Sequence, residues 1–224
     1  MKPRHEFKHS LNYMDYMILR NKLRAILPHD GNVDENGEYI IHSLYFDTPG
    51  DKALLEKLNG VNRREKFRLR RYNDDTEFIK LEKKSKVNGL SYKESSRLSK
   101  DETTMLLQGD WDWMVQQERP LVAELYSKMN GQLLQPKTIV DYTREPFTYR
   151  AGNVRITFDR DIRTGLRSRD FLGEDIPTLP AGDELVILEV KYDEFIPGFI
   201  ADLLQLGNRK ASACSKYALC RTYG

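Results

Sequence analysis

The sequence predicts an α+β protein in which an eight-stranded antiparallel β-barrel, or tunnel, has a charged lumen and helices packed on the outside. Eight segments alternate apolar with charged residues, and a period of two is typical of β-strands. Short turns such as 73–75 and 151–152 join most neighbouring strands, which indicates antiparallel pairing. Eight strands are enough to close a small barrel, and further segments with apolar residues at helical spacing would cover it.

The composition excludes several classes of protein. The 224 residues include 36 Lys and Arg against 34 Asp and Glu, and this net charge of +2 argues against coating nucleic acid by bulk charge. The only cysteines, Cys214 and Cys220, exclude a disulfide framework and a cysteine-rich zinc site. The sequence contains no apolar run long enough to span a membrane, and its start does not resemble a signal peptide. We therefore expect one domain, 1–224, located in the cytoplasm.

The expected elements follow from local patterns. Segment 12–27 has apolar residues at helical spacing and stops at Pro28, while segment 49–58 begins with the capping residue Thr48 and with Pro49. Further helices are expected at 119–129, 194–206 and 212–221, and a loop rich in glycine and proline at 165–182. The expected strands, in chain order, are 3–9, 38–46, 64–72, 76–84, 90–98, 137–149, 153–163 and 184–192.

One side of most of these strands is dominated by Lys and Arg. A single strand with one polar side is what any half-solvated sheet shows. Here six or seven strands each present Lys or Arg with few acidic residues, which is not typical of an ordinary solvated face. The aligned polar side chains are Arg4, Glu6 and Lys8; Lys66, Arg68 and Arg70; Lys80, Glu82 and Lys84; Ser91, Lys93, Ser95 and Arg97; Arg155, Thr157 and Asp159; and Glu189 and Lys191.

Two geometries accommodate these charged sides. An open sheet would expose them to water, whereas a barrel would turn them inward and surround a lumen with about ten cations. Unpaired charge is costly to bury, so such a lumen would hold water and a polyanionic ligand. Arg binds two phosphate oxygens through its planar fork, and Lys acts as a point charge. A narrow tunnel suits triphosphate or polyphosphate and does not suit duplex nucleic acid.

The few carboxylates among these cations have two interpretations. They either form internal ion pairs or hold Mg²⁺ or Mn²⁺, which carboxylate oxygens bind and which bridges to phosphates. We favour a metal role for Glu189, and both interpretations stay open for Glu82 and Glu6.

Taken in order, these motifs resemble a VTC domain. The motifs are Arg4-His5-Glu6-Phe7-Lys8, Tyr45-Phe46-Asp47-Thr48, Lys66-Phe67-Arg68-Leu69-Arg70, Leu81-Glu82-Lys83-Lys84, Tyr142-Thr143-Arg144, Val154-Arg155-Ile156-Thr157-Phe158-Asp159, Leu188-Glu189-Val190-Lys191 and Ser215-Lys216-Tyr217. This family comprises the polyphosphate polymerase domain of the vacuolar transporter chaperone complex and bacterial relatives. It belongs to the triphosphate tunnel metalloenzymes, which also include CYTH-type phosphatases.

The resemblance implies an eight-stranded tunnel that binds a nucleotide triphosphate or polyphosphate and works with a divalent metal, Mn²⁺ or Mg²⁺. The residues expected to act on the transferred phosphoryl group are Arg68, Arg70, Lys84, Arg144 and Lys216. The residues expected to bind substrate are Lys8, Lys80, Lys93, Tyr142, Arg155, Lys191 and Ser215. The expected metal ligand is Glu189, with Glu6 and Glu82 as further candidates.

The sequence departs from the phosphatase pattern at Arg4. CYTH-type phosphatases open with two glutamates and a lysine at alternate positions, and Arg4 stands where the first glutamate would be. The resemblance therefore favours the polymerase branch, which would extend polyphosphate with the γ-phosphate of ATP. Hydrolysis of triphosphates and non-catalytic sensing of polyphosphate or inositol phosphates are the alternatives. Without a sensor domain or membrane segment in this sequence, a separate membrane protein is the expected partner, at the inner face of a membrane.

Overall fold

The computed structural model describes residues 4–173, 175–182, 185–205 and 214–222. Its eight main strands form one antiparallel hydrogen-bonded sheet. The strand order is β1 (His5–Leu11), β9 (Val186–Tyr192), β7 (Val154–Thr164), β6 (Gln135–Tyr149), β2 (Tyr39–Asp47), β3 (Arg63–Tyr72), β4 (Ile79–Val87) and β5 (Leu90–Leu98). A two-residue strand, β8 (Leu179–Pro180), pairs with β7. The predicted α+β class and the eight antiparallel strands are confirmed, and β1 and β5 end the order.

The chain divides into two compact units that share strands β2, β6 and β7. Unit 1 comprises Met1–Ile40, Tyr142–Ile162 and Pro180–Lys216, and unit 2 comprises Ile41–Asp141, Arg163–Leu179 and Tyr217–Gly224. Each unit has its own buried apolar cluster. The functional side chains are therefore described unit by unit.

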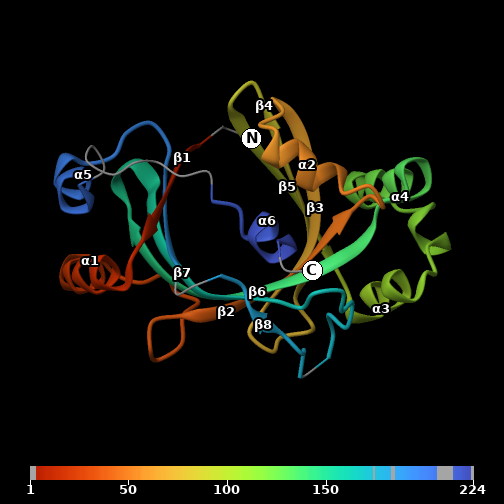
Figure 1. The fold of residues 1–224 in the computed structure, drawn as a ribbon, viewed down its shortest axis with the longest axis horizontal. Helices are drawn as coiled ribbons and strands as arrows, with labels where there is room; N and C mark the ends of the chain where they lie inside the picture. The colour runs from red at the N-terminus through yellow and green to blue at the C-terminus, as the bar shows by residue number, and fades with distance from the viewer. Residues whose placement is uncertain (1–3, 174, 183–184, 206–213, 223–224) are drawn as a thin grey trace. The chain divides into compact units, whose positions relative to one another are not determined.

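In unit 1, the apolar face of the sheet packs on two helices. These helices are α1 (Tyr13–Ile26) and the neighbouring α5 (Gly198–Leu204) (Figure 1). Helix α1 contributes Tyr16, Leu19 and Leu23 to the core, and α5 contributes Ile200 and Leu204. The strand side chains in this cluster alternate with charged ones, and they are Phe147, Val154, Ile156, Phe158, Val186, Leu188 and Val190. The charged side chains that alternate with them, Glu6 and Lys8 of β1, Arg155 and Asp159 of β7, and Glu189 and Lys191 of β9, consequently lie on the face of the sheet turned away from the helices.

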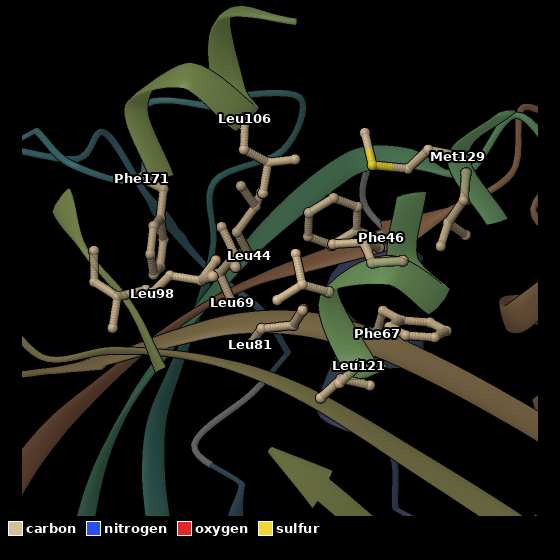
Figure 2. Close-up of a cluster of buried hydrophobic side chains, with 14 of the residues drawn as sticks. Leu44, Phe46, Phe67, Leu69, Leu81, Leu98, Leu106, Leu121, Met129 and Phe171 are labelled. Atoms are coloured by element: carbon tan, nitrogen blue, oxygen red, sulfur yellow. The ribbon is translucent and has the colours of Figure 1, made fainter. Parts of the chain in front are cut away.

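Unit 2 is built in the same way. Helix α3 (Lys100–Gln108), the short helix η1 (Asp112–Met114) and helix α4 (Pro120–Gln132) cover the apolar face of β2 to β5. Figure 2 shows side chains from the strands, among them Phe46, Phe67 and Leu81, meeting Leu106 of α3 and Leu121 of α4. Full burial of a side chain of this size stabilises the fold by roughly 1.5–3 kcal/mol, so this packing fixes which face of the sheet stays charged.

Three smaller elements complete the chain. Helix α2 (Lys52–Leu58) follows β2, and the turn η2 (Ala151–Asn153) joins β6 to β7. Helix α6 (Lys216–Arg221) buries Tyr217 and Cys220 in unit 2, where Tyr217 donates a hydrogen bond to Asp47 at 2.6 Å. The carboxylate of Asp47 also accepts hydrogen bonds from backbone N–H groups at the start of α2, which ties α6 to that helix.

Several element boundaries differ from the sequence prediction. Strand β4 begins at Ile79 because Asp75 accepts hydrogen bonds from the backbone N–H groups of Glu77 and Phe78 and holds that segment in a turn. The strand runs on to Val87, where Asn88 and Gly89, with φ of 51° and 83°, form a two-residue hairpin turn.

Helices show the same kind of difference. Helix α5 begins only at Gly198 because Pro197 disfavours helical backbone in the residue before it. Helix α2 begins at Lys52 rather than at Pro49, and α3 was not predicted at all. Part of the expected helices at 194–206 and 212–221, and of the strands at 3–9 and 184–192, falls outside the described residues.

Candidate polyanion and metal sites

The charged face of unit 2 is an ordered array of cations on β3, β4 and β5. The register pairs Arg64 with Lys86, Lys66 with Lys84, Arg68 with Glu82 and Arg70 with Lys80, while β5 adds Lys93 and Arg97 opposite Lys84 and Lys80. Nine basic residues thus share this face, four from β3, three from β4 and two from β5, with one acidic residue, Glu82. We call this set the cation array.

One row of the cation array consists entirely of lysines. Lys66 of β3 is paired with Lys84 of β4, which is paired with Lys93 of β5. Like charges directly opposite one another destabilise a sheet. A row of three lysines is therefore unfavourable unless anions lie beside it, and Lys93 of this row forms an ion pair with Glu82.

Glu82 binds to the cations that surround it. Its Oε2 accepts a hydrogen bond of 2.8 Å from Nε of Arg68 and forms an ion pair of 2.7 Å with a terminal nitrogen of the same side chain, and Nε of Arg70 lies 3.7 Å away. Its other oxygen forms an ion pair with Lys93. Burial acts to raise the pKa of the Glu82 carboxyl, but Arg68, Arg70 and Lys93 outweigh burial and hold the pKa well below its usual range. Glu82 is therefore an anion in the middle of the array.

Tyr45 also belongs to this face, because its register partner is Arg68. It is buried, and its hydroxyl oxygen accepts a hydrogen bond of 2.7 Å from Arg68. Lys66 lies 5.5 Å from the centre of its ring. Burial acts to raise the pKa of the Tyr45 phenol, but Arg68, Lys66 and Arg70 outweigh burial and lower that pKa to about 7.

The charged face of unit 1 alternates positive and negative side chains. Lys8 Nζ lies 3.1 Å from Oε1 of Glu189 and 3.1 Å from Oε1 of Glu6. The other oxygen of Glu189 lies 3.1 Å from Lys191 Nζ and 3.3 Å from a terminal nitrogen of Arg144. Burial acts to raise the pKa of the Glu189 carboxyl, but Lys191 and Lys8 outweigh it and hold that pKa well below the usual range.

Asp159 joins this set through Arg144 and Lys216. Arg144 donates hydrogen bonds to both of its oxygens, and Lys216 Nζ lies 2.5 Å from Oδ2. Lys216 also lies 4.5 Å from the centre of the Tyr142 ring. Burial acts to raise the pKa of the Asp159 carboxyl, but Arg144 and Lys216 outweigh burial and lower the pKa to about 2.

The structure thus brings the predicted site residues together in two sets. The cation array of unit 2 contains Arg68, Arg70, Lys80, Lys84, Lys93 and Glu82. The unit 1 set contains Glu6, Lys8, Tyr142, Arg144, Glu189, Lys191 and Lys216. Arg155 lies opposite Lys191 and donates hydrogen bonds to Asp30 and Tyr39, and Ser215 directly precedes α6.

Two side chains at these sites had no role in the sequence prediction. Asp159 lies on a predicted charged side, but its pairing with Arg144 and Lys216 depends on which strands are neighbours. Tyr45 lies in one of the motifs, and only the register of β2 with β3 reveals that it faces Arg68. Arg4, the residue that departs from the phosphatase pattern, forms an ion pair of 2.7 Å with Asp193.

The two faces differ in their charge balance and in their fit to a metal. In unit 1, one oxygen each from Glu6 and Glu189 converges on the single ammonium of Lys8, and carboxylate oxygens are the ligands that a hard cation prefers. In unit 2, Glu82 meets three cations instead of a second carboxylate. Within the described residues, no three His, Cys, Asp or Glu side chains are grouped so as to hold a metal ion, and Glu6 and Glu189 are two carboxylates that share the ammonium of Lys8.

A sheet with one apolar and one charged face in each unit, the charged face of unit 2 being rich in cations, defines a protein that handles phosphate or nucleotide ligands. The chain belongs to the VTC domain family, whose model matches residues 3–223. The resemblance inferred from the ordered motifs is therefore confirmed. No curated protein matches the chain.

Solved structures resemble this fold at low sequence identity. A Bacillus halodurans protein provisionally assigned as an adenylate cyclase superimposes with a TM-score of 0.54 at 14% identity, covering 92% of this chain and 87% of its own. The PH1819 protein of Pyrococcus horikoshii superimposes with a TM-score of 0.50 at 13% identity, covering 99% of both chains. These similarities support the fold.

Across the part of the chain that the structure describes, no helix has the length and apolar character needed to cross a bilayer.

Proposed function

We propose that the protein extends inorganic polyphosphate with the γ-phosphate of ATP in a metal-dependent phosphoryl transfer. The observation that carries this proposal is the charge of the cation array, in which nine basic residues share one sheet face with a single carboxylate. A triphosphate or polyphosphate chain has the charge density and the thin shape to lie along such rows. The provisional assignment of the Bacillus halodurans relative as an adenylate cyclase also fits a nucleoside triphosphate ligand.

The cations of the array act in two ways. Arg68 and Arg70 project planar forks that bind two phosphate oxygens at once, and Lys84 adds a point charge. Phosphoryl transfer passes through a loose transition state whose charge is spread over the transferred group. Fixed cations stabilise that charge without reorganising, which is the main catalytic contribution expected of such residues.

The bonds of the proposed reaction balance without a protein nucleophile. A terminal oxygen of the growing polyphosphate attacks the γ-phosphorus of ATP, a new P–O–P linkage forms, and the bond to the β,γ-bridging oxygen breaks to release ADP. The attacking oxygen is already anionic at neutral pH, so the reaction requires no strong general base. The proposed function therefore needs binding, alignment and charge stabilisation from the protein.

The proposed metal would be held by Glu6 and Glu189 in unit 1. A bound Mn²⁺ or Mg²⁺ would supply positive charge to phosphate oxygens in the transition state. The ammonium of Lys8 now lies between the two carboxylates. Lys8 would consequently exchange its carboxylate partners for phosphate oxygens when the metal binds, and Lys191 and Arg144 would keep Glu189 ionised.

Incubation of the full chain with ATP and Mn²⁺ tests the proposed function. Long polyphosphate chains on a gel support polymerisation, release of inorganic phosphate supports hydrolysis, and tight binding of triphosphate without turnover supports a sensor. Arg70→Gln should abolish the reaction that the wild type performs, whereas Arg167→Gln, a change at an exposed position, should not. Absence of both turnover and triphosphate binding would overturn the proposal.

A further inference from the structure

Two stacked tyrosines in unit 2 have opposite electrostatic surroundings. The rings of Tyr45 and Tyr217 are nearly parallel, with their centres 4.9 Å apart. The hydroxyl of Tyr217 donates its proton to the Asp47 carboxylate at 2.6 Å, and burial followed by Asp47 raises the pKa of that phenol. The hydroxyl of Tyr45 meets an arginine instead.

The proton of the Tyr45 hydroxyl has no acceptor among the described residues. The one hydrogen bond at this oxygen comes from Arg68, which is a donor, and the neighbouring cations Lys66 and Arg70 also lack lone pairs for it. A buried hydroxyl that only accepts is short of one partner when it is neutral. The ionised oxygen, which needs no acceptor, matches the site better.

The nearby carboxylates do not supply that acceptor. Asp47, two residues along β2, is occupied by Tyr217 and by backbone N–H groups of α2. Glu82 of β4 is linked to Tyr45 through Arg68, which donates a hydrogen bond to each of the two side chains. The charges that face Tyr45 from β3 are therefore uniformly positive, and they lower the pKa of its phenol to about 7.

We propose that Tyr45 is a second anion beside the cation array, in addition to Glu82, and that it is ionised without ligand and protonated when a triphosphate binds to the same cations. The inference rests on the proposed function, since it takes triphosphate as the ligand of the array. A polyanion beside Lys66, Arg68 and Arg70 cancels the field that keeps the phenolate charged. The phenolate then takes a proton from solvent, and the complex holds the triphosphate plus one proton.

Ultraviolet difference spectroscopy of the full chain tests this directly, because phenolate and phenol absorb differently. At about pH 8, a phenol with a pKa near 7 is roughly 90% ionised. Titration with inorganic triphosphate, without metal, should remove the absorbance of about one tyrosinate out of the twelve tyrosines. Calorimetry on the same sample reports binding independently.

Two variants show which tyrosine causes the absorbance change. Tyr45→Phe should still bind triphosphate but lose the absorbance change. Tyr72→Phe is the matched control, because Tyr72 lies on the same face of β3 and its pKa is also lowered, by Arg70 against the opposing effect of burial. That variant should keep the change, and its loss there instead would overturn the assignment to Tyr45.

The possible failures are distinguishable. If triphosphate binds to the wild type without an absorbance change, the role of Tyr45 is wrong and the proposed function stands. If calorimetry detects no binding of triphosphate to the wild type, both the role of Tyr45 and the proposed function are wrong. The wild-type titration decides the question even if Tyr45→Phe does not fold.

Discussion

Arg144 donates two hydrogen bonds to the carboxylate of Asp159, one from Nε to Oδ1 at 2.6 Å and one from a terminal nitrogen to Oδ2 at 2.7 Å. Both side chains are buried, and Lys216 reaches the same carboxylate. Breaking a buried ion pair by neutralising one partner leaves the other charge uncompensated. This pair therefore stabilises unit 1 while it positions two of the cations proposed to act on phosphate.

Asp159→Asn should destabilise the protein by about 3 kcal/mol at neutral pH, because Arg144 and Lys216 lose their shared anion. Urea unfolding measures the change. Asp161→Asn is the control, since Asp161 lies on the same strand, is exposed and pairs with Arg160 at the surface, where such pairs contribute about 0–1 kcal/mol. Equal effects of the two changes would contradict the assigned role of Asp159.

The same pair predicts how stability depends on pH. The pKa of Asp159 is lowered to about 2 in the folded protein, whereas an aspartate in the unfolded chain titrates near 3.8. Its contribution is therefore complete above the unfolded value and is lost as the pH falls from about 4 towards 2. Unfolding measured over this range should show the difference between wild type and Asp159→Asn shrinking as the pH falls. A constant difference would count against the ion pair as its source.

Glu82→Gln separates the two interpretations of that carboxylate. If Glu82 only forms ion pairs, the change removes the single acid of the cation array, and affinity for triphosphate should rise by about tenfold without metal. If Glu82 holds the metal, affinity without metal should change little and Mn²⁺ binding should weaken. Glu94→Gln, at an exposed position on the other face of β5, is the control and should leave both unchanged.

Glu189→Gln tests the proposed metal pair in unit 1. The amide is a weaker ligand for a hard cation, so Mn²⁺ binding followed by electron paramagnetic resonance should weaken at least tenfold, and metal-dependent turnover should fall with it. The exposed Glu194 provides the control variant, Glu194→Gln, which should bind Mn²⁺ like the wild type. Unchanged metal binding in Glu189→Gln would remove that residue from the metal site.

The sequence prediction missed helix α3 and placed the start of strand β4 wrongly, although the sequence contains a signal for both. Ser99 and Glu102 form a capping box at the start of α3, a pattern of Ser followed three residues later by Glu that marks a helix start. The start of β4 escaped because an Asp side chain, rather than an apolar pattern, decides where that strand begins. Both cases depend on side-chain hydrogen bonds that hydrophobic periodicity does not report.

The sequence by itself determined which side chains share a face of each strand, because alternation is a local consequence of extended backbone. That rule already placed Lys66, Arg68 and Arg70 together and apart from Phe67 and Leu69. Only the tertiary structure decided which charges meet. The pairing order of the strands joins residues far apart in the chain, so it alone fixed the ion pairs of Glu189 with Lys8 and Arg144 and the Arg68 contact of Tyr45.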